Sequence, residues 1–384
     1  MNVPTKDRRH FLQLASLALA DLALGGPVSC TTMAAVPPKY SSSAKGRVVL
    51  ALRPLKENVS RIRIFDWDDD RFDEVEAPIG VVHSITQDDN DPNVLYLFEI
   101  FGSCVKFNVA TKAFTKIDHR GKREMFNGHG ALSHTGEFVA CTEIVQDQGS
   151  MVSLRSSKDL SRVAMLPKEC NNSHHVVSLP KTPLMAAGIL RSLDGKEAGA
   201  ITFYDTETRK VTNRIEFPFP VLHLMPLSST EVIGLSLLTR WKRDDKTALS
   251  TERDTAQNIA SFSDTQTHVP GPIYYATTDG RSETLWSEKD KSMFLDNFGL
   301  AKISGRSFLS GHHGSGKVIL WEDLKMKKTF DVPRPKNLLV SRDGTELLLL
   351  SEERLMIYSM KTFEPIRSFN DWPDVISFSS YHAI

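Results

Sequence analysis

The hydrophobic pattern of this chain repeats along its length. Short runs of alternating apolar and polar residues end at an apolar or aromatic anchor, then a polar turn and a second short run follow. Such alternation predicts β-strands. Seven copies are found, with anchors at Phe65, Phe107, Leu154, Tyr204, Tyr275, Trp321 and Tyr358. The anchors are 42, 47, 50, 71, 46 and 37 residues apart, and most of these steps are near the roughly 40–50 residues of a β-propeller blade.

Each copy resembles the third and fourth strands of a blade, and the first two strands precede it. These first two strands are clearest at 132–139 and 339–347, where a tight turn separates two apolar runs. The chain is therefore predicted to be all-β, a seven-bladed β-propeller with four-stranded antiparallel blades. The 71-residue step contains an insertion at 239–270, rich in Arg, Lys, Asp, Thr and Ser, which we expect to be a long loop between the second and third strands of its blade.

The ends of the chain are predicted to close the ring. The first copy lacks an inner strand, and the chain after Phe369 has room for one more strand, at Val375–Phe378. Pairing of this strand with the N-terminal strands at 48–53, 61–67 and 72–76 would complete the seventh blade and remove free sheet edges. A two-domain β-sandwich is the alternative fold.

The N-terminus resembles an export signal. Arg8 and Arg9 precede Phe11-Leu12 and a mildly apolar stretch, as in a twin-arginine signal, whose route carries folded proteins. Residues 1–35 are assigned to this signal and 36–384 to a single propeller domain, which predicts a periplasmic protein. Cys30 follows a lipoprotein-like sequence, so its lipidation would tether the domain to a membrane, whereas cleavage near Ala34 would release it. An amphipathic N-terminal helix is the alternative.

Charge and composition exclude some functions. Lys plus Arg and Asp plus Glu both number 47, so no net positive charge is available to neutralise nucleic-acid phosphates. No apolar run reaches the eighteen or so residues that span a bilayer. We expect a monomer. Three cysteines of the mature domain, Cys104, Cys141 and Cys170, have no close-pair spacing and are predicted to be buried and unpaired.

Four histidines recur with the blade period. His83, His129, His174 and His223 are 46, 45 and 49 residues apart, which places each at the start of an innermost strand. Innermost strands surround the central channel, so four imidazoles of consecutive blades are predicted to face one another there. Imidazole binds iron, copper and zinc. One predicted role of the four histidines is therefore to bind a transition-metal cofactor such as iron or copper. The alternative is that the histidines are structural and hydrogen-bond to neighbouring blades.

Other polar residues occur near the same predicted face. Glu99 and Glu143 hold equivalent places in two second strands, where a carboxylate could accept the second N–H of a metal-bound imidazole. His312, His313 and Asn337 are further candidates for the channel mouth. Hydrolase, zinc-protease, phosphate-loop and dinucleotide-binding motifs are missing.

Two stretches resemble an uncharacterised bacterial family of exported propellers. Gly128-His129-Gly130 through Thr142-Glu143 is similar to the family pattern H-G-x-x-S-x-x-G…T-E, and the stretch 173–189 is similar to P-H-E-x-x-x-x-P…N-G-G-I. Ser173 and His175 replace the proline and glutamate of the second pattern. The family has a twin-arginine signal, and its genes are often found beside imelysin-type iron-uptake lipoproteins. The resemblance implies an envelope protein with a partner in iron uptake.

Two functions are open at this point. One is a cell-envelope binding module whose channel mouth holds a metal or small ligand. The other is a metal-dependent oxidoreductase, similar in principle to propeller oxygenases that hold iron with four histidines. The lack of a second reactive group of residues favours binding.

Overall fold

The computed structural model describes residues 45–52, 59–69, 71–80, 82–88, 90–117, 124–146, 148–170, 172–191, 199–236, 270–351, 354–369 and 381–383. The predicted export signal, with Arg8, Arg9 and Cys30, lies outside these residues, as do residues 239–269 of the predicted insertion. In the described part of the chain no helix has the length and apolar character that a membrane span needs.

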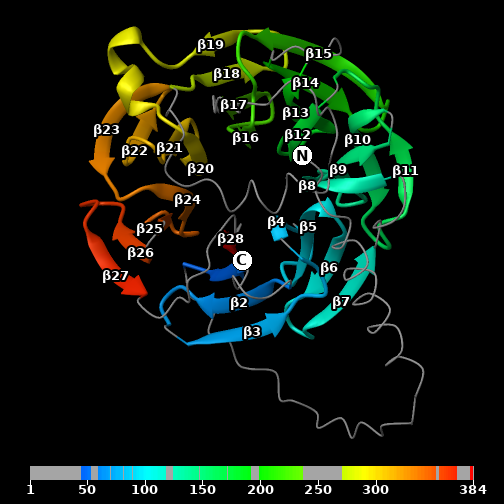
Figure 1. Ribbon diagram of the computed structural model, residues 1–384, viewed down its shortest axis with the longest axis horizontal. Helices are drawn as coiled ribbons and strands as arrows, with labels where there is room; N and C mark the ends of the chain where they lie inside the picture. The colour runs from blue at the N-terminus through cyan, green and yellow to red at the C-terminus, as the bar shows by residue number, and fades with distance from the viewer. Residues whose placement is uncertain are drawn as a thin grey trace, which may run out of the picture. The chain divides into compact units, whose positions relative to one another are not determined.

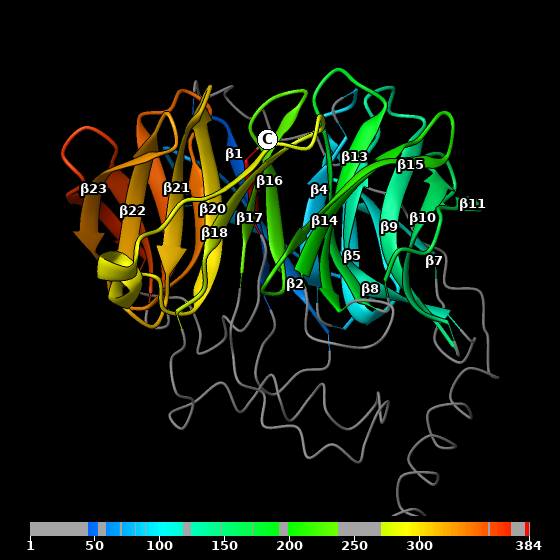
Figure 2. The ribbon, with the colours of Figure 1, turned by 90° about the horizontal axis from the view of Figure 1, so that it is seen from above.

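Seven four-stranded antiparallel blades form a β-propeller (Figures 1 and 2), which confirms the predicted fold. The second and third blades are joined into one eight-stranded sheet, because the end of β5 pairs with the start of β8. The strands of each blade are named in order from the innermost to the outermost. The first four blades are β28(Tyr381–Ala383)-β1(Arg47–Leu52)-β2(Arg61–Asp66)-β3(Phe72–Glu76), β4(Val82–Gln87)-β5(Val94–Gly102)-β6(Cys104–Asn108)-β7(Ala113–Ile117), β8(Glu124–Leu132)-β9(Phe138–Val145)-β10(Gly149–Ser156)-β11(Arg162–Met165) and β12(Asn172–Ser178)-β13(Leu184–Arg191)-β14(Gly199–Asp205)-β15(Lys210–Phe217).

The last three blades complete the ring. They are β16(His223–Pro226)-β17(Glu231–Leu235)-β18(Ile273–Thr277)-β19(Ser282–Thr284), β20(Asn297–Ser304)-β21(Ser307–His312)-β22(Lys317–Glu322)-β23(Lys325–Asp331) and β24(Pro335–Val340)-β25(Glu346–Ser351)-β26(Leu355–Ser359)-β27(Pro365–Phe369). A short 3-10 helix, η1(Glu288–Met293), connects the fifth and sixth blades. The insertion falls between β17 and β18, the second and third strands of the fifth blade.

The chain termini close the first blade, as predicted, but through a later strand. β28 pairs antiparallel with β1, and Leu50 lies opposite Tyr381. The inner strand is therefore Tyr381–Ala383, whereas the predicted strand at 375–378 lies outside the described residues. The prediction rested on the room that the chain after Phe369 leaves for one strand, and the strand that pairs with β1 begins six residues later than predicted, at Tyr381.

The core lies between neighbouring blades. The middle strands are buried on both faces, as in β17 and β18, while the outermost strands β3 and β23 are largely exposed. Where the closing blade meets the seventh, Trp67 packs with Leu50, Leu348 and Ile357. Burying each large apolar side chain adds about 1.5–3 kcal/mol to the free energy of unfolding, so these contacts stabilise the closed ring.

The innermost strands share an irregularity that determines where the channel side chains point. The pairing register shifts near the start of β4 at His83, of β8 between Phe126 and Gly130, and of β12 at His174. Similar shifts occur in β20 and β24. An extra residue in one strand bends that strand and changes the direction of its side chains. These β-bulges therefore determine where the side chains near the start of the innermost strands point.

Candidate metal centre

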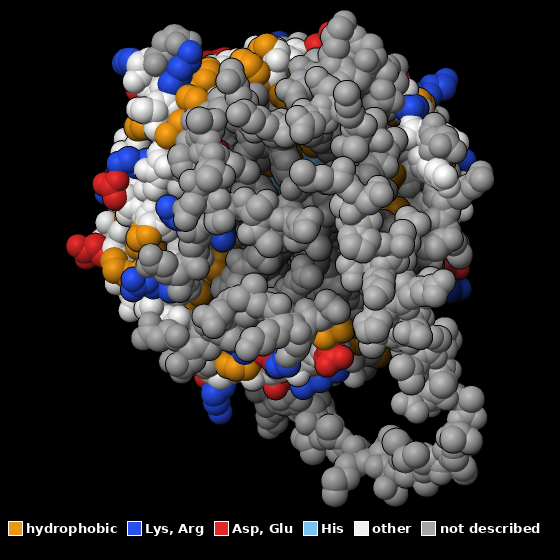
Figure 3. Space-filling model, viewed as in Figure 1, with side chains coloured by type: hydrophobic (Ala, Val, Ile, Leu, Met, Phe, Trp, Pro, Cys, Tyr) orange, Lys and Arg blue, Asp and Glu red, His pale blue; other side chains and the backbone are white. Residues whose placement is uncertain are grey.

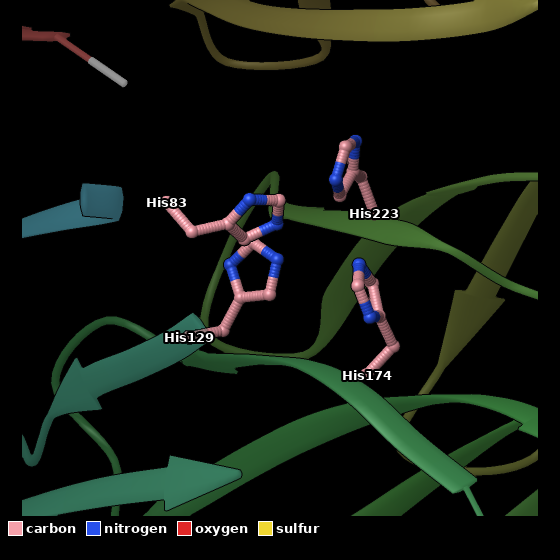
Figure 4. A group of neighbouring side chains, drawn as sticks. All are labelled: His83, His129, His174 and His223. Carbon is pink, nitrogen blue, oxygen red and sulfur yellow. The ribbon is translucent and has the colours of Figure 1, made fainter. Parts of the chain in front are cut away.

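The four histidines with the blade period come together on the inner side of the ring of blades. They extend from β4, β8, β12 and β16, the innermost strands of four consecutive blades (Figures 1 and 4). One ring nitrogen of each can be chosen such that all four lie within 4.8 Å of one another. The ring centroids of His83 and His129 are 4.5 Å apart, and those of His129 and His174 are 4.7 Å apart.

Glycine makes this arrangement possible. Gly128 has φ +85° within the bulge of β8, a conformation that side chains with a Cβ rarely adopt, and an added Cβ would lie 2.7 Å from Cδ2 of His83. Gly130 makes room for the ring of Phe98, because its Cβ would come within 2.2 Å of that ring. The Gly-His-Gly sequence thus holds His129 between two glycines that let His83 and Phe98 approach.

His129 is the centre of the cluster. It is 4 % exposed, and neither its Nδ1 nor its Nε2 has a hydrogen-bond partner within the described structure. An unsatisfied buried polar atom costs about 1–3 kcal/mol, so such an atom in a folded protein needs an explanation. A ligand atom between the rings would satisfy one of these nitrogens.

Three of the four histidines, His83, His129 and His174, are neutral at neutral pH. Burial, together with repulsion from the nearby His223, lowers the pKa of His83 to about 3. Burial, together with repulsion from the neighbouring imidazoles, also holds the pKa values of His129 and His174 well below the usual value for histidine. Neutral imidazoles keep a lone pair, which is the form that binds metal ions.

A fifth histidine, His175, belongs to the cluster and was not predicted as a site residue. Its ring centroid lies 4.3 Å from that of His129 and 5.5 Å from that of His223. The bulge in β12 falls at His174, so two consecutive side chains face the same group of rings. The backbone N–H of Leu224 donates to Nδ1 of His175 at 2.8 Å. The sequence signal was the pair His174-His175, whose second member would point to the opposite face in a regular strand.

The two glutamates have other partners than the imidazoles. Glu99 accepts from the backbone N–H of Gly80 at 3.0 Å and of Ser103 at 2.9 Å. Glu143, fully buried, accepts from Arg155 Nε at 2.6 Å and from Arg162 Nη2 at 2.7 Å. Burial alone would raise the pKa of Glu143, but the hydrogen bonds and charge of Arg155 outweigh it and lower that pKa.

These contacts correct the prediction that Glu99 and Glu143 accept the second N–H of a metal-bound imidazole. Among the described residues, neither carboxylate is hydrogen-bonded to an imidazole. Both carboxylates instead fix backbone or arginine groups next to the innermost strands. The sequence could not show this, because Arg155 and Arg162 reach Glu143 only through the pairing of β9 with β10 and of β10 with β11.

His312 has a structural role. It is fully buried, its Nδ1 lies 2.6 Å from Oδ1 of Asn297, and its Nε2 lies 2.8 Å from Oγ of Ser310. Trp321 donates to the same Ser310 oxygen, and the Asn297 amide donates to the backbone oxygens of Ser236 and Gly271. Both ring nitrogens of His312 are therefore engaged in a hydrogen-bond chain that joins the fifth and sixth blades, which corrects the prediction that His312 belongs to the channel mouth.

The other candidates lie outside the cluster of rings. The backbone N–H of His313 donates to the oxygen of Asp296, which fixes the turn after β21. Asn337 follows the bulge in β24, and its Oδ1 accepts from the N–H of Leu338 at 3.0 Å. Cys104, Cys141 and Cys170 are buried and free, as predicted. Both signs of charge occur around the rim of the face in Figure 3.

Comparison with known proteins gives the fold alone. No protein-family model and no curated protein matches the chain. Similar solved structures include the WD40 repeats of RRP9 (8 % identity, TM-score 0.55, 75 % of this chain and 80 % of that one) and hydrazine synthase of Kuenenia stuttgartiensis (10 %, 0.57, 88 % and 100 %). A third is the dihydro-heme d1 dehydrogenase NirN in complex with DHE (10 %, 0.53, 97 % and 85 %). At these identities the likeness extends to the propeller architecture and no further.

Proposed function

We propose that this propeller binds one transition-metal ion between His83, His129, His174 and His223, and that it works as a metal-binding module. The observation that carries the proposal is His129, a buried imidazole with both ring nitrogens unsatisfied and with three further imidazoles around it. A hydrogen-bonding role would have given His129 a partner, as it gave His312 two. A metal ion takes up one lone pair from each ring and explains why four rings converge.

The spacing of the nitrogens supports iron or copper. With metal–nitrogen bonds of about 2.0–2.1 Å, neighbouring ligands of a tetrahedral ion lie about 3.4 Å apart, and opposite ligands of a square or octahedral ion lie about 4.2 Å apart. The observed limit of 4.8 Å is closer to the second arrangement. The rings would need to close in by about half an ångström, which is a small side-chain adjustment.

Metal analysis of the purified protein tests the proposal. The wild-type protein, isolated after growth with iron, copper and zinc, should contain about one metal ion per chain. His129→Ala should lose most of it and still unfold cooperatively, because the blades pack without the metal. His134→Ala, in an exposed turn after β8, is the matched control and should keep the metal. A wild-type protein without bound metal would overturn the proposal.

We also propose that the module works in the periplasm, with a partner in iron uptake. The support is the sequence: the paired Arg8 and Arg9, and the resemblance to exported propellers encoded near iron-uptake lipoproteins. Replacing both arginines by lysine should keep the precursor in the cytoplasm on cell fractionation. Cys30→Ser should release the protein from the membrane if Cys30 is lipidated. Normal export of the double-lysine variant would contradict the twin-arginine route.

A further inference from the structure

The Nδ1 of His175 is engaged in a hydrogen bond to the backbone. The N–H of Leu224 points at this nitrogen from 2.8 Å, so Nδ1 carries the lone pair and accepts. In a neutral imidazole only one nitrogen carries the proton, so Nε2 of His175 carries it. A protonated nitrogen cannot bind a metal ion. Both nitrogens of His175 are therefore unsuited to be ligands, although its ring is as close to His129 as that of His174.

The bond from Leu224 also fixes the ring. Leu224 follows His223 in β16, so His175 connects the innermost strand of the fourth blade with the residue beside a proposed ligand. The ring of His175 lies 5.5 Å from that of His223 and cannot turn without losing this bond. A donor held in this way beside a metal ion is suited to a group that the ion itself binds.

The charge of the site indicates which group that is. Four neutral imidazoles leave the two positive charges of a divalent ion uncompensated. The two nearby glutamates, which could have compensated them, are occupied by backbone amides and arginines. A small anion on the metal would supply the missing negative charge and would accept the hydrogen bond of a fixed N–H.

From these contacts, and on the basis of the proposed metal site, we infer that His175 is not a ligand but a positioning residue whose Nε2–H donates to a small anion bound to the metal ion. The site then takes two ligands from outside the chain: a divalent transition metal, and an anion such as hydroxide or an oxyanion. His174 binds the metal and His175 selects its anionic partner, so the two consecutive histidines have separate tasks.

Azide binding to the copper-loaded full-length protein tests this inference. Azide is a small anion that accepts hydrogen bonds, and its binding to Cu(II) gives a charge-transfer absorption that can be titrated. His175→Leu removes the donor but keeps an apolar side chain, so it should hold the same amount of copper and bind azide about tenfold to a hundredfold more weakly. His175→Gln can accept from Leu224 and still donate, so it should restore much of the azide affinity.

The outcomes separate this inference from the proposed function. A wild-type protein that takes up no copper and no other metal overturns the proposed site and this inference with it. Normal copper content with equal azide affinity in wild type and His175→Leu overturns only the inference, as does loss of copper from a folded His175→Leu protein. If that variant does not fold, nitrogen NMR of the zinc-loaded wild type decides. His175 should show a protonated Nε2 and a metal-free Nδ1, and a zinc-bound His175 would contradict the assignment.

Discussion

The imidazole of His83 lies against Gly128, so closely that a single added Cβ on that glycine would come within 2.7 Å of Cδ2 of the ring. The two residues belong to neighbouring blades. Gly128, in β8, therefore limits the position of a proposed ligand in β4, a strand of the neighbouring blade.

Gly128→Ala should damage the site as well as the fold. The positive φ of Gly128 would cost an alanine about 1–2 kcal/mol of stability, and the new methyl group would push His83 away from the other rings. We expect a lower melting temperature and a loss of most bound metal. Gly344→Ala is the matched control, since Gly344 also has positive φ but has nothing within 4 Å of an added Cβ. Equal metal content in the two variants would contradict the role of Gly128.

Glu143→Gln should destabilise the protein without changing its metal content. Glu143 is fully buried and paired with Arg155, which is 3 % exposed, and breaking a buried ion pair by removing one partner costs about 3–5 kcal/mol. Chemical unfolding and metal analysis of the same sample check both parts. Loss of metal at unchanged stability would contradict this prediction and would indicate that Glu143 supports a metal-bound imidazole.

Acid should destabilise the metal-free protein below about pH 6.5. Above that pH, His83 is neutral in both the folded and unfolded states, so it adds no pH dependence. Below about pH 6.5, His83 of the unfolded chain binds a proton, whereas His83 of the folded protein stays neutral down to its pKa of about 3. The free energy of unfolding therefore falls as the pH falls. His312, with a pKa also lowered to about 3 by burial, contributes in the same direction.

The size of this effect can be measured by chemical unfolding between about pH 7.5 and pH 4. Each such histidine contributes about 1.4 kcal/mol per pH unit below about pH 6.5 and nothing above it. His129→Gln should make the dependence shallower, because burial and the neighbouring rings lower the pKa of His129 in the same way. The exposed His134→Gln serves as the control. An unchanged slope in His129→Gln would contradict a lowered pKa of His129 in the folded protein.

Removal of residues 381–384 should open the ring. β28 is the inner strand of the closing blade, and its loss exposes the unpaired edge of β1, along which Val48–Leu50 pair with it. We expect aggregation or a broadened, non-cooperative thermal transition in calorimetry. A truncated protein that melts as sharply as the full chain would mean that the pairing of β28 with β1 does not hold the ring closed.

Much of the fold was predictable because a repeat converts weak local signals into one strong signal. The spacing of His83, His129, His174 and His223 follows the blades for the same reason, and it placed all four on innermost strands. The bulge that brings His175 to the same side as His174 was not predictable, since a shift of one residue in register leaves no mark in the amino-acid pattern.

Contacts between strands were equally hidden from the sequence. Glu143 looked like a partner of an imidazole because of its place in the blade, and only the pairing of its strand with β10 brought Arg155 to it. His312 shows the converse error: its position near a strand end suggested the channel, but the hydrogen bonds of Asn297 and Ser310 hold it inside the sheet.

Each of the four converging imidazoles belongs to a different blade, and the last follows the first by 140 positions in the sequence. The shortest fragment that contains all four, residues 83–223, comprises three blades and the start of the first strand of a fourth. A shorter piece of the chain therefore lacks at least one of the four histidines. If the ion binds as proposed, its four ligands come together only after these three blades have packed. Metal loading would then report on folding, because a chain that carries the ion already has three of its seven blades in place.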